Sequence, residues 1–338
     1  MTGLDTLTAP TAPPWWDDAV TQAPDATVFQ SAAWGRYIGA DRDVRYVWAI
    51  TDGRPIGLLL TQGPRLRRPR GFRTLRDDPG HCTWRHGPLV IDGDPGVITG
   101  ALLGDVDRHA RRAGIRRVEG ATAPLGAAPA VHTAYANLGY QHDTAATMLV
   151  DLTPSIDELW RNLKPSARKA LAAAERAGLT VRRLERDEPL DDYLTILGET
   201  RRRLGLPLPP HHPTAAMRQA FAGSASALEV FVAMRGDRIM GGLGVIGFGD
   251  TASEIAVAQS DEAAHDRLYT GDVIKWAVLQ WAKDHKYRRY DLGGVEPDPK
   301  DAKAAGIRQF KEKWGGALVE YAVYRRHRRG VIRRLLGR

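Results

Sequence analysis

The stretch GIRQFKEKWGG, from Gly306 to Gly316, places residues that could do chemistry on a short helix. Phe310 and Trp314 are four residues apart and share one helical face, and Lys311 stands beside Phe310 before a glycine pair that stops the helix. A lysine in this setting is either a solvated surface charge or a positioned cation that stabilises a developing negative charge. The stretch by itself leaves both interpretations open.

A second candidate group follows a predicted strand in YDLGGVEPD. Gly293 and Gly294 permit a positive φ or a close backbone approach, and their N–H groups could bind an anion or a carbonyl oxygen. Asp291 could accept a proton from an attacking ammonium, or it could fix the turn by accepting backbone hydrogen bonds, and Glu296 is a second carboxylate nearby. Tyr290 points to the opposite face from Asp291 in a strand, so we expect only one of them to line a cleft.

The composition describes a globular chain that is larger than one typical domain. Its 338 residues, 43% hydrophobic and 26% charged, predict two domains. No segment approaches the run of about eighteen apolar residues that a membrane helix needs. The first residues have neither the basic nor the apolar region of a signal peptide, and the single cysteine, Cys82, suits a reducing compartment. We therefore expect a cytoplasmic protein, and the absence of HxxxH or HExxH spacing argues against a metal site.

Basic residues outnumber acidic ones and are concentrated in patches. The net charge is +8, and the stretch from Arg325 to Arg338 carries seven arginines and no acid. Such patches are typical of a surface for polyphosphate, such as an RNA backbone or an anionic membrane face, but also of solvated helix faces. The candidate phosphate-binding residues are Lys164, Arg168, Lys169, Arg325, Arg326, Arg328 and Arg329.

A weak internal duplication divides the chain into two halves. Residues 53–63 and 236–249 each indicate a turn followed by a buried strand, and each half ends in a further strand, 147–152 or 318–325. Helical and extended periods alternate, which predicts an α/β (α+β) fold with mixed sheets in two tandem domains. The predicted parts are a disordered leader (1–14), a first domain (15–150), a second domain (151–322) and an Arg-rich tail (323–338) that could pack back on the first domain.

Two helices are predicted just after the boundary near residue 150. Thr153 or Ser155 can cap the first, and Glu158 completes a capping box if Ser155 is the cap. Pro165 begins the second helix and Gly178 ends it.

The order of elements in the second half resembles N-acyltransferases of the GNAT type. These domains bind the pyrophosphate of acyl-CoA on a glycine-rich loop at the N-terminus of their central helix. In HDRLYTGDVIKWAVLQWA only Gly271 remains of that loop, and Tyr269 and Asp272 stand where a bare, uncharged backbone would be needed. We therefore expect a donor other than acyl-CoA.

Five segments resemble, in order, the FemXAB family: FQSAAWGRY (29–37), WRHGPLVIDGD (84–94), LWRNLKPSARKALAAAERAGLTV (159–181), YDLGGVEPD (290–298) and GIRQFKEKWGG (306–316). The resemblance implies tandem GNAT-like domains that transfer an amino acid from aminoacyl-tRNA to an amine, most often on a peptidoglycan precursor. It implies no metal or organic cofactor. The sequence lacks a heptad stretch long enough for the coiled-coil arm of larger members, which indicates the short, armless form.

The resemblance also implies roles for the candidate residues of the second half. Lys311 is expected to contact the donor end and stabilise the oxyanion of the tetrahedral intermediate, and Phe310 to wall the site or pack against the terminal adenosine. Asp291 could assist proton removal. The remaining donor-binding candidates are Tyr290, Gly293, Gly294 and Glu296.

The acceptor is less defined, with candidates Gln30, Trp34 and Arg36 in the first half. Relatives that bind a nucleotide-linked muropeptide have a lysine where Ile38 stands and an arginine near Asp250. The acceptor therefore stays open between a peptidoglycan precursor and an amine on a peptide or nucleoside natural product. Two other functions also stay open: an acyl-CoA-dependent N-acyltransferase, and a non-catalytic protein that binds RNA or a membrane surface through its Arg-rich tail.

Overall fold

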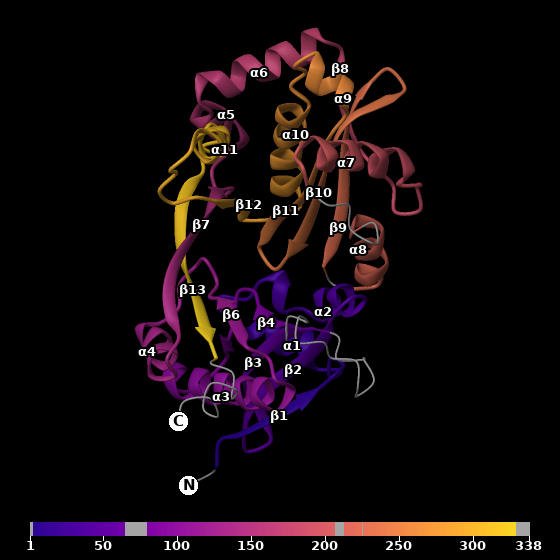
Figure 1. Ribbon diagram of the computed structural model, residues 1–338. Helices are drawn as coiled ribbons and strands as arrows, with labels where there is room; N and C mark the ends of the chain where they lie inside the picture. The colour runs from indigo at the N-terminus through magenta and orange to yellow at the C-terminus, as the bar shows by residue number, and fades with distance from the viewer. Residues whose placement is uncertain (1–2, 65–79, 207–212, 225, 329–338) are drawn as a thin grey trace, which may run out of the picture. The chain divides into compact units, whose positions relative to one another are not determined.

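The computed structural model describes residues 3–64, 80–206, 213–224 and 226–328, which belong to two compact units. The first unit comprises residues 1–145 and 320–338, and the second comprises residues 146–319. Each unit is built from a sheet with helices packed on it (Figure 1), which confirms the predicted α/β class. The chain passes between the units inside β7 (Gln141–Asp151) and again inside β13 (Ala317–His327).

The first unit is built on a mixed sheet in the order β1-β2-β3-β4-β6-β13, with β5 paired to β3. Neighbouring strands in it are antiparallel except β4 and β6, which are parallel. Its elements are β1 (Asp5–Ala9), α1 (Trp16–Gln22), the 3-10 helix η1 (Val28–Gln30), α2 (Ala32–Gly39), β2 (Asp43–Thr51), β3 (Arg54–Gly63), β4 (His81–Trp84), β5 (Leu89–Val90), α3 (Pro95–Ala113), β6 (Arg117–Ala121) and α4 (Pro129–Asn137).

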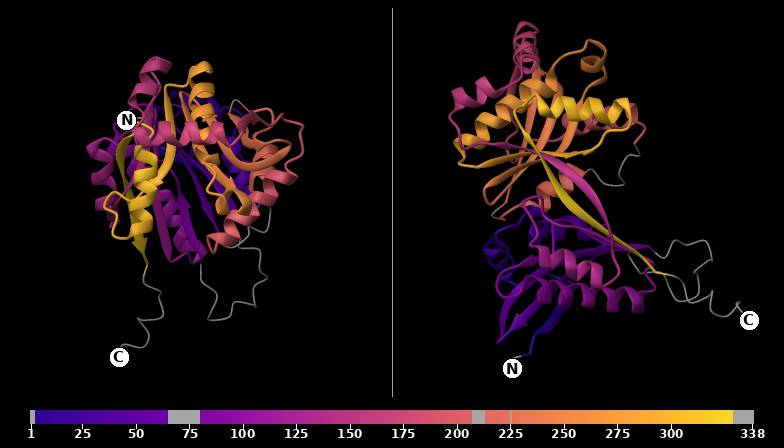
Figure 2. Two further views of the ribbon diagram at one scale, coloured as in Figure 1. Left: turned by 90° about the horizontal axis from the view of Figure 1, so that it is seen from above. Right: turned by 90° about the vertical axis from the view of Figure 1, so that its left-hand side faces the viewer.

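Helices cover both faces of this sheet, because successive residues of β2 such as Tyr46 and Val47 are both buried and point to opposite faces. Val47 lies in the core formed with α3 and α4, which lie side by side (Figure 2). Tyr46 points the other way and packs edge-on against Trp16 of α1, with ring centroids 4.9 Å apart. Both apolar faces of β2 are therefore buried, one under each layer of helices.

The prediction of a disordered leader across residues 1–14 is wrong for residues 5–9. They form β1, which pairs antiparallel with β2 from Asp5 opposite Ile50 to Ala9 opposite Tyr46. Leu4 packs against the core of the unit. The stretch is short and polar, so its order comes from a distant hydrogen-bonding partner rather than from any local signal.

The second unit is a mixed sheet in the order β7-β12-β11-β10-β9-β8, in which β12 and β11 are parallel and the other neighbours antiparallel. Besides parts of β7 and β13, its elements are α5 (Ile156–Asn162), α6 (Pro165–Arg176), β8 (Leu179–Arg183), α7 (Asp191–Arg203), α8 (Pro213–Phe221), β9 (Ala227–Arg235), β10 (Arg238–Phe248), β11 (Thr251–Gln259), α9 (Asp261–His265), α10 (Thr270–Asp284), β12 (Arg289–Val295) and α11 (Ala302–Glu312).

Helices α10 and α7 pack on opposite faces of this second sheet (Figure 1). A side chain at Gly241 would collide with Thr270 of α10, and one at the next residue, Gly242, would collide with Tyr193 of α7. Successive residues of a strand point to opposite faces, so the two glycines let both helices approach β10 closely. The sheet therefore lies between α7 and α10. Helix α10 is the helix predicted in the stretch HDRLYTGDVIKWAVLQWA as the central helix of this half.

The two predicted helices after the boundary are confirmed. Ser155 and Glu158 form a capping box at the start of α5, so Ser155 is the cap. Helix α6 begins at Pro165, and Gly178 follows its end with a φ of 72°. Within the described residues, no helix has both the length and the apolar character needed to cross a bilayer.

Candidate active site

A cavity opens in the second unit where two parallel strands separate. β11 and β12 pair only from Thr251 opposite Arg289 to Ser253 opposite Asp291. Beyond these pairs lies a cavity of about 330 Å³, whose walls include residues from both strands and from α10 and α11. Ligands of α/β proteins commonly bind beyond the carboxyl ends of parallel strands, which makes this cavity the candidate site. Its lining residues are Gly242, Leu243, Glu254, Ile255, Val257, Gly271, Ile274, Lys275, Leu292, Gly293, Phe310 and Lys311.

Both strands are irregular at the point where they separate. On β11, Glu254 lies opposite Val245 and Ala256 opposite Gly244, so Ile255 between them is an extra residue. On β12, the register also shifts between Asp291 and Gly294, where Gly293 has a φ of 80°. Bulges bend and twist a strand, so these two irregularities explain why pairing stops here.

Asp291 holds the irregular turn of β12. Its Oδ1 accepts a hydrogen bond from the N–H of Gly293 at 2.8 Å and another from the Thr147 hydroxyl. The residue is 9% exposed, and burial raises the pKa of its carboxyl group. Of the two roles predicted for Asp291, this geometry favours fixing the turn.

Helix α11 brings Phe310 and Lys311 to the cavity. The ammonium of Lys311 donates a hydrogen bond to the carbonyl oxygen of Gly294 at 2.8 Å, and loss of hydration lowers the pKa of Lys311. Trp314, 1% exposed, packs in the core of the unit and so anchors the chain just after the end of this helix. Lys311 is therefore a positioned cation rather than a freely solvated one.

Lys313 and Asp272 connect α11 to the central helix. Lys313 forms a largely buried ion pair with Asp272 in the first turn of α10, and its ammonium lies 4.2 Å from the centre of the Phe310 ring. Burial raises the pKa of Asp272. A carboxylate in the first turn complements the positive end of the helix dipole. The N-terminus of α10, where a GNAT-type domain would bind phosphate, is thus next to the carboxylate of Asp272 and its partner Lys313.

A buried ion pair that sequence reasoning missed lies in the cavity wall. Glu254 Oε1 accepts hydrogen bonds from the Tyr290 hydroxyl at 2.5 Å and from the ammonium of Lys275, and both charged side chains are only 5% exposed. Burial, and then the nearby Glu254 carboxylate, raise the pKa of Tyr290. A signal was available, because charged residues seldom occur inside otherwise apolar stretches such as SEIAV and DVIKWAV.

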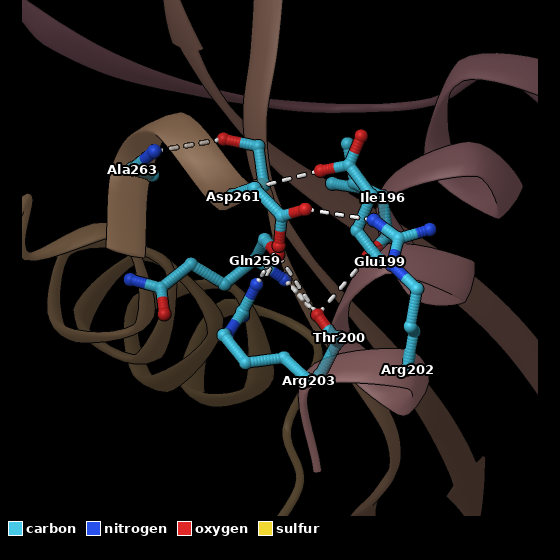
Figure 3. A network of polar contacts seen from close by, with 9 residues as sticks. Ile196, Glu199, Thr200, Arg202, Arg203, Gln259, Asp261 and Ala263 are labelled. Carbon is cyan, nitrogen blue, oxygen red and sulfur yellow. Dashed lines mark hydrogen bonds and ion pairs between the residues drawn. The ribbon is translucent and has the colours of Figure 1, made fainter. Parts of the chain in front are cut away.

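A network of polar contacts fixes the far end of β11 (Figure 3). The Thr200 hydroxyl on α7 accepts a hydrogen bond from the Gln259 N–H at 2.7 Å. Arg202 donates to Asp261 at 2.7 Å, and Arg203 donates both to Asp261 and to the carbonyl oxygen of Gln259. The end of β11 is therefore tied to α7 and α9.

The structure divides the predicted donor-binding residues into three groups. Gly293, Phe310 and Lys311 line the cavity. Tyr290 and Gly294 reach it indirectly, through Glu254 and Lys311 respectively, as described above. Glu296 is exposed and is not among the lining residues. Tyr290 and Asp291 do point to different partners, but neither lines the cavity itself.

The predicted acceptor residues lie in the first unit, where two of them serve the fold. Gln30 is fully buried: its side chain donates to the carbonyl oxygen of Arg85 at 2.6 Å and accepts from the N–H of Leu60 at 2.7 Å. Trp34 is buried and packs edge-on against Phe29. Arg36 is exposed on α2, so of the three only Arg36 presents its side chain to solvent.

The basic residues predicted to bind phosphate on α6 differ in their surroundings. Lys164 pairs with Glu312 at 3.1 Å, and Arg168 donates hydrogen bonds to the carbonyl oxygens at the end of α5, including that of Leu163. Lys169 is exposed.

The C-terminal arginines that the structure describes are largely engaged within the first unit. Arg325 and Arg326 belong to β13, and Arg328 follows it and donates to the backbone carbonyl oxygen of Asp107 at 3.2 Å. Arg325 pairs with Glu119 at 3.1 Å and with Asp143 at 2.5 Å, and Arg326 pairs with the buried Asp107. Arg329 lies outside the described residues. The described arginines therefore anchor β13 and the residue after it to the first unit.

Comparison with known proteins identifies the fold. The family model described as an acetyltransferase (GNAT) domain matches residues 160–312, which include all the lining residues of the cavity named above. The crystal structure of FemX matches with a TM-score of 0.73 at 16% sequence identity, covering 94% of this chain and 96% of that chain. The chain has the tandem GNAT-like fold of FemX. The resemblance to the FemXAB family is thus confirmed at the level of the fold.

Two further solved structures share this GNAT-like fold. One is the C-terminal domain of a putative lysylphosphatidylglycerol synthetase from Agrobacterium fabrum, with a TM-score of 0.58 and 15% identity over 94% of each chain. The other is a tandem GNAT protein from the clavulanic acid biosynthesis pathway, with a TM-score of 0.60 and 14% identity over 96% of this chain and 98% of that chain. None of the curated proteins compared with the sequence matches it significantly. Together the GNAT domain and these neighbours support an acyltransferase.

Proposed function

We propose that this protein is an aminoacyltransferase that takes an amino acid from aminoacyl-tRNA and joins it to an amine by an amide bond. The observation that carries the proposal is the position of Lys311, whose ammonium is held by Gly294 in the wall of the cavity. An ammonium has three N–H donors, and one is used by this hydrogen bond. The other two are available to an oxyanion that forms in the cavity.

The reaction needs little from the protein because an aminoacyl ester is already activated. The neutral acceptor amine attacks the ester carbonyl carbon, and a tetrahedral intermediate forms whose oxyanion Lys311 stabilises. The carbon–oxygen bond of the ester then breaks, the ribose hydroxyl of the tRNA leaves, and the nitrogen loses a proton to solvent or to the leaving oxygen. A preorganised donor to an oxyanion contributes about 10²- to 10³-fold in rate.

The surroundings of α10 support an aminoacyl ester over acyl-CoA as the donor. The first turn of that helix carries the buried carboxylate of Asp272. A pyrophosphate bound at the same helix end would compete with this carboxylate for its counter-ion Lys313, which would weaken its binding. A donor whose phosphates lie elsewhere, such as the 3′ end of a tRNA, avoids that conflict.

Acyl-CoA-dependent N-acyl transfer is the second candidate function. It is favoured by the description of the matching family as an acetyltransferase domain and by the fold shared with the tandem GNAT protein of the clavulanic acid pathway. In either case the acceptor is an amine. For the aminoacyl reaction it is either a peptidoglycan precursor or a peptide or nucleoside natural product, and the supply of aminoacyl-tRNA places the reaction in the cytoplasm.

The test offers the full-length protein two sets of donors in parallel. One set is total tRNA charged with individually labelled amino acids, and the other is labelled acetyl-CoA. Each set is combined with a nucleotide-linked muropeptide or with a small peptide amine. Transfer of one amino acid label into a product that resists mild alkali, where esters hydrolyse, supports the proposal. Transfer of acetyl label alone contradicts it and establishes the second candidate.

A further inference from the structure

Glu254 presents one free carboxylate oxygen to the cavity. Both of its donors, the Tyr290 hydroxyl and the Lys275 ammonium, contact Oε1. No described residue donates a hydrogen bond to Oε2. The protein also does not fully enclose this atom. Because Glu254 lines the cavity, Oε2 is open to whatever occupies it.

The two contacts on Oε1 fix the orientation of this carboxylate. The side chain is 95% buried, and rotating it would leave Lys275, equally buried, without its counter-ion. Separating a buried ion pair in this way is costly. A rigid carboxylate with one vacant acceptor atom in a largely apolar cavity is suited to bind a group with N–H donors and positive charge.

We propose that Glu254 Oε2 binds the α-ammonium of the aminoacyl group, so that the cavity selects donors with a free α-amine. This inference rests on the proposed function and deepens it. Lys311 and Glu254 line the same cavity, so one donor can place the oxygen that becomes the oxyanion at the Lys311 cation and its α-ammonium, one carbon away from the carbonyl, at the Glu254 carboxylate. An acyl group without an α-ammonium would leave the charge at Oε2 without a counter-ion even where an α-hydroxyl donates a hydrogen bond to it, and such an analogue is disfavoured.

The ammonium at Glu254 belongs to the donor rather than to the acceptor on chemical grounds. An acceptor amine must be neutral to attack, whereas an ion pair with a carboxylate stabilises the protonated, unreactive form. The donor's α-amine takes no part in bond formation, and as an ammonium it withdraws electrons from the ester carbonyl. Holding it protonated therefore favours the reaction.

The experiment compares two donors that differ only at the α position. The cognate aminoacyl-tRNA found in the donor test is used directly and after its α-amino group has been converted to a hydroxyl. We expect wild type to prefer the amino donor in kcat/KM. For Glu254→Gln we expect a loss of about 10- to 100-fold with the amino donor and little change with the hydroxyl donor, so the preference collapses. The ratio of the two rates does not depend on the fraction of folded enzyme.

Lys275 supplies the matched controls. Lys275→Gln keeps the Glu254 carboxylate, so its preference for the amino donor should persist. The double variant Glu254→Gln/Lys275→Gln leaves no buried charge unpaired and should lose the preference, which covers the case in which Glu254→Gln alone fails to fold.

Three outcomes overturn the inference. One is a wild-type enzyme that uses both donors equally well, and another is an equal loss with both donors in the Glu254 variants, which would mark a purely structural role. The third is a raised KM for the acceptor with either donor, which would assign the ammonium to the acceptor. A wild-type protein that transfers from no aminoacyl-tRNA at all instead refutes the proposed function itself.

Discussion

Replacing Lys311 by methionine tests the oxyanion role most directly. Methionine keeps an unbranched side chain of similar length and removes only the charge and its N–H donors. The structural loss is one hydrogen bond to the carbonyl oxygen of Gly294, and such a bond contributes about 1 kcal/mol to stability. The catalytic loss is larger, since removal of one preorganised oxyanion donor costs about 3 to 4 kcal/mol of transition-state stabilisation. We therefore expect kcat to fall by about 10²- to 10³-fold while the protein stays folded.

The assay is single-turnover transfer from labelled aminoacyl-tRNA to the acceptor, accompanied by thermal unfolding of each variant. Lys303→Met is the matched control, because Lys303 is an exposed lysine on the same helix α11. That variant should keep the wild-type rate and melting temperature. A Lys311→Met enzyme that retains a rate within a few-fold of wild type would show that the oxyanion is stabilised elsewhere, and the mechanism would have to be abandoned.

Three further predictions follow from the same site. Desolvation lowers the pKa of Lys311 below its ordinary 10.5, so the cation loses its proton as pH rises and kcat should begin to fall below pH 10.5. Arginine stays charged at these pH values, so a pH–rate profile of Lys311→Arg should lack this fall. Trp314→Ala should lower the free energy of unfolding by about 3 to 5 kcal/mol in urea titrations, since Trp314 is buried in the core, and an unchanged midpoint would contradict that anchoring role. Asp291→Asn keeps an oxygen for the N–H of Gly293, so its transfer rate should stay near wild type while that of Asp291→Ala falls; an equal fall in both would identify Asp291 as a base.

The parts of the fold that the sequence could predict are those with local causes. The capping box at Ser155 and the helix that starts at Pro165 depend on residues a few positions apart, and both are confirmed. The helical face predicted for Phe310 and Trp314 is not formed, because α11 ends at Glu312 and Trp314 enters the core from the turn that follows. Residues 5–9 were predicted wrongly because their order depends on β2, a partner some forty residues away along the chain.

Local reasoning could have marked Glu254 and Lys275 as unusual charges in apolar stretches, but it could not have paired them, for the same physical cause. Glu254 and Lys275 lie on a strand and on a helix, and only the packing of α10 against the sheet brings their charges together. Each looks like an isolated polar residue in its own segment. Arg325 and Arg326 were likewise assigned to an Arg-rich tail that could pack back on the first domain and bind phosphate, but local reasoning could not name their partners, because Glu119 and Asp107 are distant in sequence.

Asp272 shows how a residue that weakens one function can support another. In the sequence it counts against a phosphate-binding loop, because its charge stands at the start of the central helix. In the structure the same carboxylate binds Lys313, and Lys313 lies over the ring of Phe310, beside Lys311 on α11. The charge that disfavours a pyrophosphate therefore also holds in place the helix that carries Lys311.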